Sequence, residues 1–521
     1  MPEFNEPFFK RLSTHSIVGE LAGLRDWTIY LGAGATIDRT GMSWRGLVKK
    51  LLNEFESDES LQDAILNTHG EIRTATIVEG LYKASYGDTS QMNDDVRKLL
   101  YKSRRFMKGR LLESVAGLAY HLAKRGDSVV VVTPNYDAYA STEIGSHIAL
   151  AGKTDAADPP VELSIYVATD IDPTLPDVSV PHTITCAYVH GFIGGLTRSR
   201  AADRELDEPI VLSEGQYYAT YGRTRNVLRA ALHDRNVLII GSAVSDPPLV
   251  DALRDTRPAD EQEPVKRYAI LPMQSGEFYE PGRSRETTRL PDWNARRLDD
   301  VGVVPIYCDF YSQAGQFVHE VHKCMERGDA DTMRNNYSPH RYRSRLNDWW
   351  GRWHQSNCGG GNSQTAHHDL LLRRLSAIKR VLNSTIDESL KLDMWIRWHP
   401  ESQRQLTLWA SSLGTWVDQN AMRSVDIPRN TGHIAVGAFC NGAPTFAEEP
   451  SDVDARWRTY LGVPIWLDMP TTGDIPVGVM TLASMRDSSS SSVSERNLMR
   501  LKTVLDEMRA AGAEIATARA D

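Results

Sequence analysis

The sequence predicts an α/β fold, a Rossmann-like doubly wound parallel sheet, followed by a smaller α+β domain with an antiparallel sheet. Short apolar runs alternate with amphipathic segments in the first 325 residues, as in a parallel sheet covered by helices. Period-two segments lie between two amphipathic stretches in residues 365–521, as in an antiparallel sheet flanked by helices. A length of 521 residues also favours more than one domain.

The elements of the first domain, 1–325, are expected in the following order. An apolar run at 28–32 ends at Gly32, and Ser43 is the expected N-cap of a helix over 43–55. A second helix is predicted over 107–126 and ends at Gly126. The remaining predictions are strands at 128–137, 186–191, 266–271 and 301–309, and a strand, turn and helix over 235–253.

Residues 326–364 are polar, rich in Arg and Trp, and end in a Gly- and Ser-rich stretch, which is typical of a linker. A helix is predicted over 366–390, with an apolar stripe of Leu371, Leu375, Ile378, Leu382 and Ile386. Five strands are expected at 393–400, 404–412, 433–442, 460–469 and 475–485. A serine-rich loop and a final helix over about 493–517 complete the second domain, 365–521.

Composition limits the classes of function. The net charge of −9 gives no overall attraction to nucleic acid or to an anionic membrane. None of the five cysteines forms a C-x-x-C pair, so reduced thiols and a cytoplasmic location are expected. No apolar run reaches about 18 residues, and the N-terminus does not resemble a signal peptide.

The apolar run "WTIYLGAGAT" ends in a turn of small residues. Gly32 and Gly34 allow a phosphate to approach the backbone, and Ala33 and Thr36 belong to the same turn. No Gly-Lys-Ser/Thr follows, so the turn is not a P-loop. The third glycine of the dinucleotide-binding fingerprint is also absent.

Three further strands end in residues that are suited to a site. The strand over 128–137 ends in Thr133, Asn135 and Asp137, and "YVHG" places His190 before a glycine. Ligands bind at the carboxyl ends of parallel strands, and a neutral imidazole is a general base near pH 7. The last such end is the Gly241-Ser242 pair. Each residue alone has a plain structural alternative as a turn or core residue.

In this order the motifs resemble the sirtuin superfamily, over roughly residues 25–325. Those motifs are Gly-Ala-Gly, a loop with Arg45, Thr-x-Asn-x-Asp, His-Gly and Gly-Ser. The forms "SWR" and "GSAVSDP" are most similar to prokaryotic sirtuin-like proteins of antiphage defence. The spacer of the family's Gly-x-Ser motif is missing here.

The resemblance implies roles for the matching residues. Ala33, Gly34 and Thr36 would line a pyrophosphate site, and Arg45 would lie in a loop over the cofactor. Asn135 and Asp137 would lie beside the nicotinamide ribose, and His190 would be the general base. Gly241 and Ser242 would contact the adenosine half of NAD+.

Protein-deacylating sirtuins carry a zinc module with two cysteine pairs, whereas here only Cys186 is near the expected position. Deacylation is therefore disfavoured, and no metal is expected. The resulting expectation is a regulated NAD+ glycohydrolase that releases nicotinamide and ADP-ribose and depletes NAD+ in antiphage defence. The alternatives are a sensor that binds an NAD derivative without hydrolysis and assembles, and an ADP-ribosyltransferase.

The second domain resembles a GAF sensory domain in "YLGVPIWLD" and "GDIPVGVMTLASM". That resemblance implies an α+β fold that binds a small molecule or mediates dimerisation. The expected partners are NAD+, a small-molecule or phage-derived activator at this domain, a second copy of the chain and a possible partner protein. No membrane partner is expected.

Overall fold

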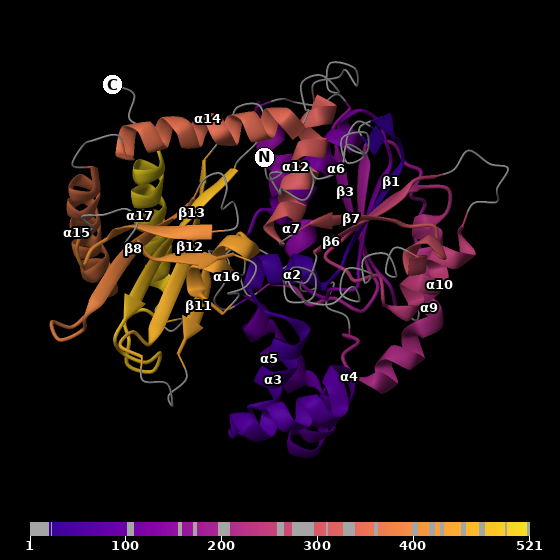
Figure 1. The fold of residues 1–521 in the computed structure, drawn as a ribbon. Helices are drawn as coiled ribbons and strands as arrows, with labels where there is room; N and C mark the ends of the chain where they lie inside the picture. Colours follow the sequence, from indigo (N-terminus) through magenta and orange to yellow (C-terminus); the bar gives the residue numbers. More distant parts are fainter. Residues whose placement is uncertain are drawn as a thin grey trace.

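The computed structural model (Figure 1) has two sheets that lie side by side. None of its described helices has the length and apolarity needed to cross a bilayer. The structure describes all residues except 1–19, 22, 102–108, 155–158, 170–173, 196–208, 258–264, 273–295, 309–310, 327–338, 359–362, 399–404, 416–421, 428–431, 450–454, 468–474, 495–497 and 518–521.

The first sheet has seven strands, all parallel. In spatial order they are β3 (Glu162–Val167), β4 (Thr183–Tyr188), β2 (Val129–Thr133), β1 (Trp27–Leu31), β5 (Asn236–Ile240), β6 (Arg267–Pro272) and β7 (Val304–Cys308). The chain begins in the middle and adds strands first on one side and then on the other, which confirms the doubly wound fold. Strand β3, at one edge of the sheet, was not predicted from the sequence.

Helices cover both faces of this sheet. The core on one face includes residues of α6 (Leu111–Lys124), α7 (Tyr139–Thr154) and α12 (Ser312–Glu326). The core on the other face includes residues of α9 (Glu214–Leu232) and α10 (Pro247–Asp255). Every residue of β1 and β2 is buried, because both faces of these central strands are covered.

A helical unit with its own small core lies beside the sheet and appears at the bottom of Figure 1. It consists of α3 (Trp44–Leu52), α4 (Glu59–Tyr86) and α5 (Ser90–Tyr101). The predicted cap of α3 is confirmed, because Ser43 Oγ accepts a hydrogen bond of 3.1 Å from the backbone N–H of Gly46. Helices α4 and α5 were not predicted from the sequence.

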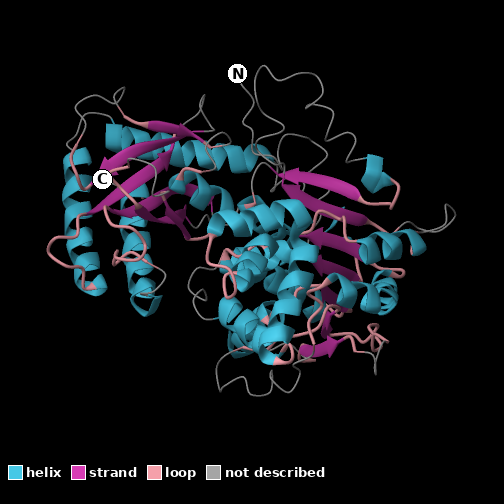
Figure 2. Ribbon diagram, turned by 90° about the horizontal axis from the view of Figure 1, so that it is seen from below, coloured by secondary structure: helices cyan, strands magenta, loops and turns pink. Residues whose placement is uncertain are grey.

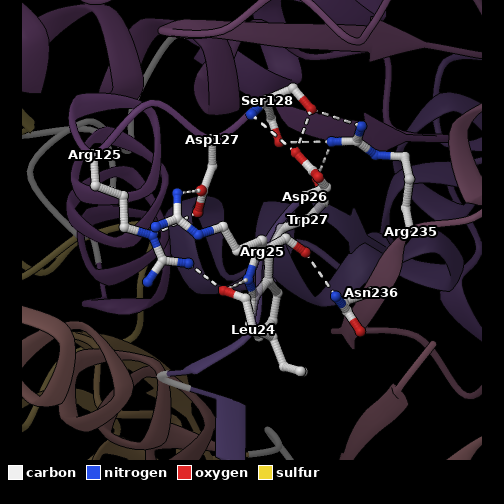
Figure 3. A network of polar contacts seen from close by, with 9 residues as sticks. All are labelled: Leu24, Arg25, Asp26, Trp27, Arg125, Asp127, Ser128, Arg235 and Asn236. Atoms are coloured by element: carbon white, nitrogen blue, oxygen red, sulfur yellow. Dashed lines mark hydrogen bonds and ion pairs between the residues drawn. The ribbon is translucent and has the colours of Figure 1, made fainter. Parts of the chain in front are cut away.

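Arg235 joins the starts of the three central strands (Figure 3). Its guanidinium donates to the backbone carbonyls of Trp27 and Ser128, at 2.9 and 2.7 Å, and to Ser128 Oγ at 2.9 Å. Nearby, Asn236 Nδ2 donates to the Arg25 carbonyl at 2.6 Å. These starts are the amino ends of the parallel strands, so the cluster lies at the sheet edge opposite the strand ends with the candidate motifs.

The second sheet has six antiparallel strands and is curled (Figure 2). In spatial order they are β10 (Ser424–Asp426), β9 (Gln405–Ser411), β8 (Leu390–Arg397), β13 (Ile475–Ser484), β12 (Thr459–Leu467) and β11 (Thr445–Glu448). Helices α15 (Ser363–Leu382) and α17 (Leu498–Ala516) share a core with one side of the sheet, and α16 (Ile434–Asn441) packs against its other side. The predicted antiparallel sheet with flanking helices is confirmed.

Two predictions in this domain are wrong. Residues 433–442 form helix α16 and not a strand, because His433 caps its start and Gly442, at φ 64°, ends it. The alternating apolar and small residues resembled a strand, but the helix is buried and has no polar face to show its period. Ile386 does not extend the stripe of α15: the helix ends at Leu382, and Ile386 is fully exposed.

The region expected to be a linker contains helix α14 (Pro339–Cys358). Its Trp349 and Trp353 are buried and donate indole hydrogen bonds of 2.9 and 2.8 Å to the carbonyls of Ala516 and Ile515 in α17. Its Gly-rich end, 359–361, lies outside the described residues. One apolar cluster extends from α6 and α12 through these two tryptophans to α15 and α17, so the two sheets share a core.

Candidate functional site

A cavity of about 600 Å³ opens at the carboxyl ends of β1, β2, β4 and β5. This volume is within the usual range for small-molecule sites, about 300–1,000 Å³. Four of the five predicted motifs, those at the strand ends, contribute to its wall. The predicted residues that line it are Gly32, Ala33, Thr36, Asn135, Asp137, His190, Gly241 and Ser242.

The glycine turn is the start of a helix. Gly32 is the N-cap of α2 (Ala33–Thr40), so the amino end of the helix meets the cavity. Gly34 does not line the cavity. It faces β5 and Tyr311 instead, where a Cβ would lie 1.7 Å from the Tyr311 hydroxyl oxygen and 2.7 Å from Cα of Gly241. Gly34 is therefore required by close packing, which holds the first turn of α2 against the end of β5.

The end of β2 is tied to that turn by three hydrogen bonds. Asn135 Nδ2 donates to the Gly32 carbonyl at 2.9 Å, and Thr36 Oγ1 donates to Asp137 Oδ2. Thr133 is buried beneath the site and donates to the Leu31 carbonyl at 2.7 Å, so it supports the wall without lining it. Burial raises the pKa of Asp137, and the hydrogen bonds from Thr36 and the Tyr139 backbone oppose that shift.

His190 follows β4 and lies buried in the cavity wall. Burial, with a smaller contribution from the charge of Arg223, lowers the pKa of His190 to about 4. The imidazole is therefore neutral at pH 7, which is the form that accepts a proton. Its ring meets the Tyr217 ring edge to face, with the centroids 5.9 Å apart.

Tyr217 and Asp246 extend this wall, and neither was predicted as a site residue. The Tyr217 hydroxyl donates to Asp246 Oδ1 at 2.6 Å, whereas Asp246 Oδ2 is buried without a hydrogen-bond partner among the described residues. Burial raises the pKa of Asp246. The motif "GSAVSDP" contains Asp246 and was a usable signal, but nothing in the sequence around Tyr217 marked it.

Arg45 is not brought to the cavity. It belongs to α3, where its guanidinium donates to Asn67 Oδ1 at 2.6 Å and lies 3.6 Å from the Glu71 carboxylate.

The Ser242 hydroxyl helps to shape the loop that follows β5. It accepts a hydrogen bond of 3.1 Å from the backbone N–H of Val244.

Residues 129–298 match the family model of the SIR2-like domain. The match begins at β2 and includes Asn135, His190 and Gly241, whereas the glycine turn lies before it. No curated protein matches the chain significantly. A SIR2-like domain implies the use of NAD+, and the cavity lies at the strand ends of that domain and of β1.

Proposed function

We propose that the chain is a regulated NAD+ glycohydrolase, which cleaves NAD+ with water to nicotinamide and ADP-ribose. The observation that carries this proposal is the meeting of four strand ends around one cavity, where neutral His190 and Asn135 both line the wall. A SIR2-like domain makes NAD+ the expected ligand of that cavity.

The cavity wall suits the parts of NAD+. The amino end of α2 carries partial positive charge and favours the pyrophosphate. Asp246 Oδ2, which has no hydrogen-bond partner in the described part of the chain, is an acceptor for a ribose hydroxyl, and Gly241 and Ser242 are nearby for the adenosine half. The Thr36–Asp137 bond then fixes the helix start relative to β2.

Each polar group has a distinct role in this proposal. His190 accepts a proton from a ribose hydroxyl, and Asn135 uses its side-chain carbonyl to orient the attacking water while its amide donates to Gly32. Nicotinamide leaves as a neutral molecule, so a dry pocket favours its departure over the cationic ground state. Asp137 holds the turn and is not the nucleophile.

Hydrolysis is favoured over deacylation because the chain lacks the cysteine pairs of a sirtuin zinc module. Cys186, the one cysteine near the expected place, is buried in β4, and burial raises the pKa of its thiol to about 12. Mass spectrometry of NAD+ products, with and without lysate of phage-infected cells, tests the proposal. Tight NAD+ binding without turnover would favour the sensor, and ADP-ribose attached to a macromolecule would favour the transferase.

The proposed activity is expected to depend on pH through His190. Since its pKa is about 4 in the folded protein, the neutral base persists well below pH 6.5. We expect kcat/KM to be unchanged from pH 7.5 to pH 5.5 and to fall near pH 4. Steady-state rates of nicotinamide release, with substrate and buffer controls at each pH, measure this profile. Loss of half the activity near pH 6.5 would contradict it.

The lowered pKa of His190 also makes the folded protein less stable at acidic pH. Between about pH 4 and 6.5 the unfolded chain binds a proton at His190 that the folded chain does not bind. The stabilisation due to neutral His190 is therefore complete above pH 6.5 and is lost as the pH falls towards 4. Intrinsic fluorescence recorded at each pH separates unfolding from a loss of catalysis.

Regulation by the second, GAF-like domain is part of the proposal. Ser312 at the start of α12 donates to the Phe439 carbonyl of α16 at 3.3 Å, and the adjacent Tyr311 packs against Gly34 in the glycine turn. A movement of α16 caused by an activator would thus reach the start of α2. In antiphage defence, such control prevents loss of NAD+ in uninfected cells.

Gly442→Ala tests this connection. A Cβ at Gly442 would lie 2.5 Å from Cβ of Ser312, so the contact between the domains must open. We expect NAD+ turnover without an activator to rise severalfold, because the restraint on α12 is weakened while no cavity residue changes. Gly87→Ala is the matched control, because Gly87 also ends a helix at a positive φ, 89°, and a Cβ there meets none of the described residues within 4 Å. A folded Gly442→Ala protein with the wild-type basal rate would refute the coupling.

A further inference from the structure

Two facing helices bring three metal-binding side chains together outside the cavity. His322 and Glu326 are four residues apart on α12 and therefore lie on the same face of that helix. His121 joins them from α6, and one potential ligand atom from each of the three residues lies within 4.8 Å of the other two. None of the three lines the candidate NAD+ cavity.

The donor atoms suit a borderline transition-metal ion. Zn²⁺ binds imidazole nitrogen and carboxylate oxygen at about 2.0–2.2 Å, commonly with four ligands. Ligand atoms around a tetrahedral ion are about 3.4 Å apart by that geometry, so small side-chain rotations bring this group into place. The site needs one more ligand, which water can supply because the Glu326 side of the site is exposed to solvent. His322, on the opposite side, is only 8 % exposed.

The surroundings of His121 bear on its use as a metal ligand. The imidazole of His121 lies beside that of His322, with the ring centroids 5.7 Å apart. The positive charges of Lys124 and Arg125 oppose the binding of a metal cation nearby. The charge of Arg125 is offset, because its guanidinium pairs with the Asp127 carboxylate at 2.5 Å.

We propose that His121, His322 and Glu326 bind one Zn²⁺-like divalent ion, which clamps α6 to the end of α12. The role is structural, since the group does not line the cavity. The clamp would fix α12, the helix whose first residue, Ser312, contacts α16. Tyr311, which packs against Gly34, directly precedes this helix. Without a metal, the His322–Glu326 contact of 3.2 Å would be an ordinary pair on one helix.

The test uses the full chain after removal of metal with a chelator. Titration with Co²⁺, followed by its visible absorption, is expected to show one tightly bound ion per chain in a low-symmetry site. Zn²⁺ should displace it, and either ion should raise the midpoint of thermal unfolding. His322→Ala and His121→Ala should abolish the absorption band and the thermal shift, and Glu326→Gln should weaken binding at least tenfold.

Controls separate loss of the site from loss of the fold. Glu326 is exposed, so Glu326→Gln should retain the wild-type circular dichroism spectrum. His233→Ala removes another histidine that pairs with a carboxylate, Asp234 at 2.9 Å, and should leave Co²⁺ binding unchanged. The proposal is overturned if the wild-type chain binds no Co²⁺ or Zn²⁺, or if folded Glu326→Gln and His322→Ala bind as the wild type does.

Discussion

Replacement of His190 by alanine is expected to lower the rate of nicotinamide release from NAD+ by about 10²–10⁴-fold, the usual contribution of a general base. His190 is buried in the cavity wall, and its low pKa keeps it neutral at the pH of the assay. The measurement is nicotinamide release by activated protein, or by Gly442→Ala if that variant is active alone. NAD+ binding by calorimetry is expected to change far less than turnover.

Asn135→Ala is expected to reduce turnover by a similar factor, because it removes both the water-orienting amide and the bond to Gly32. Thermal unfolding of each variant distinguishes a lost catalytic group from a disturbed fold. The matched control for His190→Ala is His69→Ala, which removes an exposed histidine on α4 and should retain full activity. Wild-type turnover by a folded His190→Ala protein would exclude His190 as the base.

The strand ends were the part of the site that the sequence predicted best. Asn135, His190 and Gly241 each follow a short buried strand, and parallel strands necessarily place their carboxyl ends at one edge. Arg45 was less predictable, since its direction depends on how α3 packs against α4, where Asn67 and Glu71 bind it. Tyr217 reaches the cavity from a helix whose sequence shows no such role.

Elements with a strong local pattern were predicted, and elements defined by tertiary packing were not. The β-branched run of β2 could be identified because both of its faces are buried. Helix α16 was mistaken for a strand because surrounding residues bury it, which removes the polar face that reveals a helical period. The fit of α16 against β12 depends on Gly462, where a Cβ would lie 2.9 Å from Cβ of Ala438, and no periodicity encodes this contact.

Arg235→Met is expected to destabilise the first domain by about 2–6 kcal/mol, because two buried carbonyls lose their donor at about 1–3 kcal/mol each. Arg235 is 5 % exposed, and its five-donor guanidinium joins β1, β2 and the start of β5. Methionine retains the apolar volume but leaves the Trp27 and Ser128 carbonyls buried without these donors. Such a cost is a large part of the stability of a typical domain, about 5–15 kcal/mol.

Arg25→Ala is the matched control within the same cluster. Arg25 also bonds to a carboxylate, Asp127 at 3.0 Å, but its side chain is 67 % exposed, and Arg125 continues to pair with Asp127 when Arg25 is removed. Because Arg25 is largely exposed and the buried Asp127 carboxylate keeps Arg125 as a partner, the loss of Arg25 should cost at most about 1 kcal/mol, and the urea midpoint should change little. Urea unfolding followed by tryptophan fluorescence compares the variants. If Arg235→Met unfolds at the same urea concentration as Arg25→Ala, Arg235 does not hold the amino ends of the strands together.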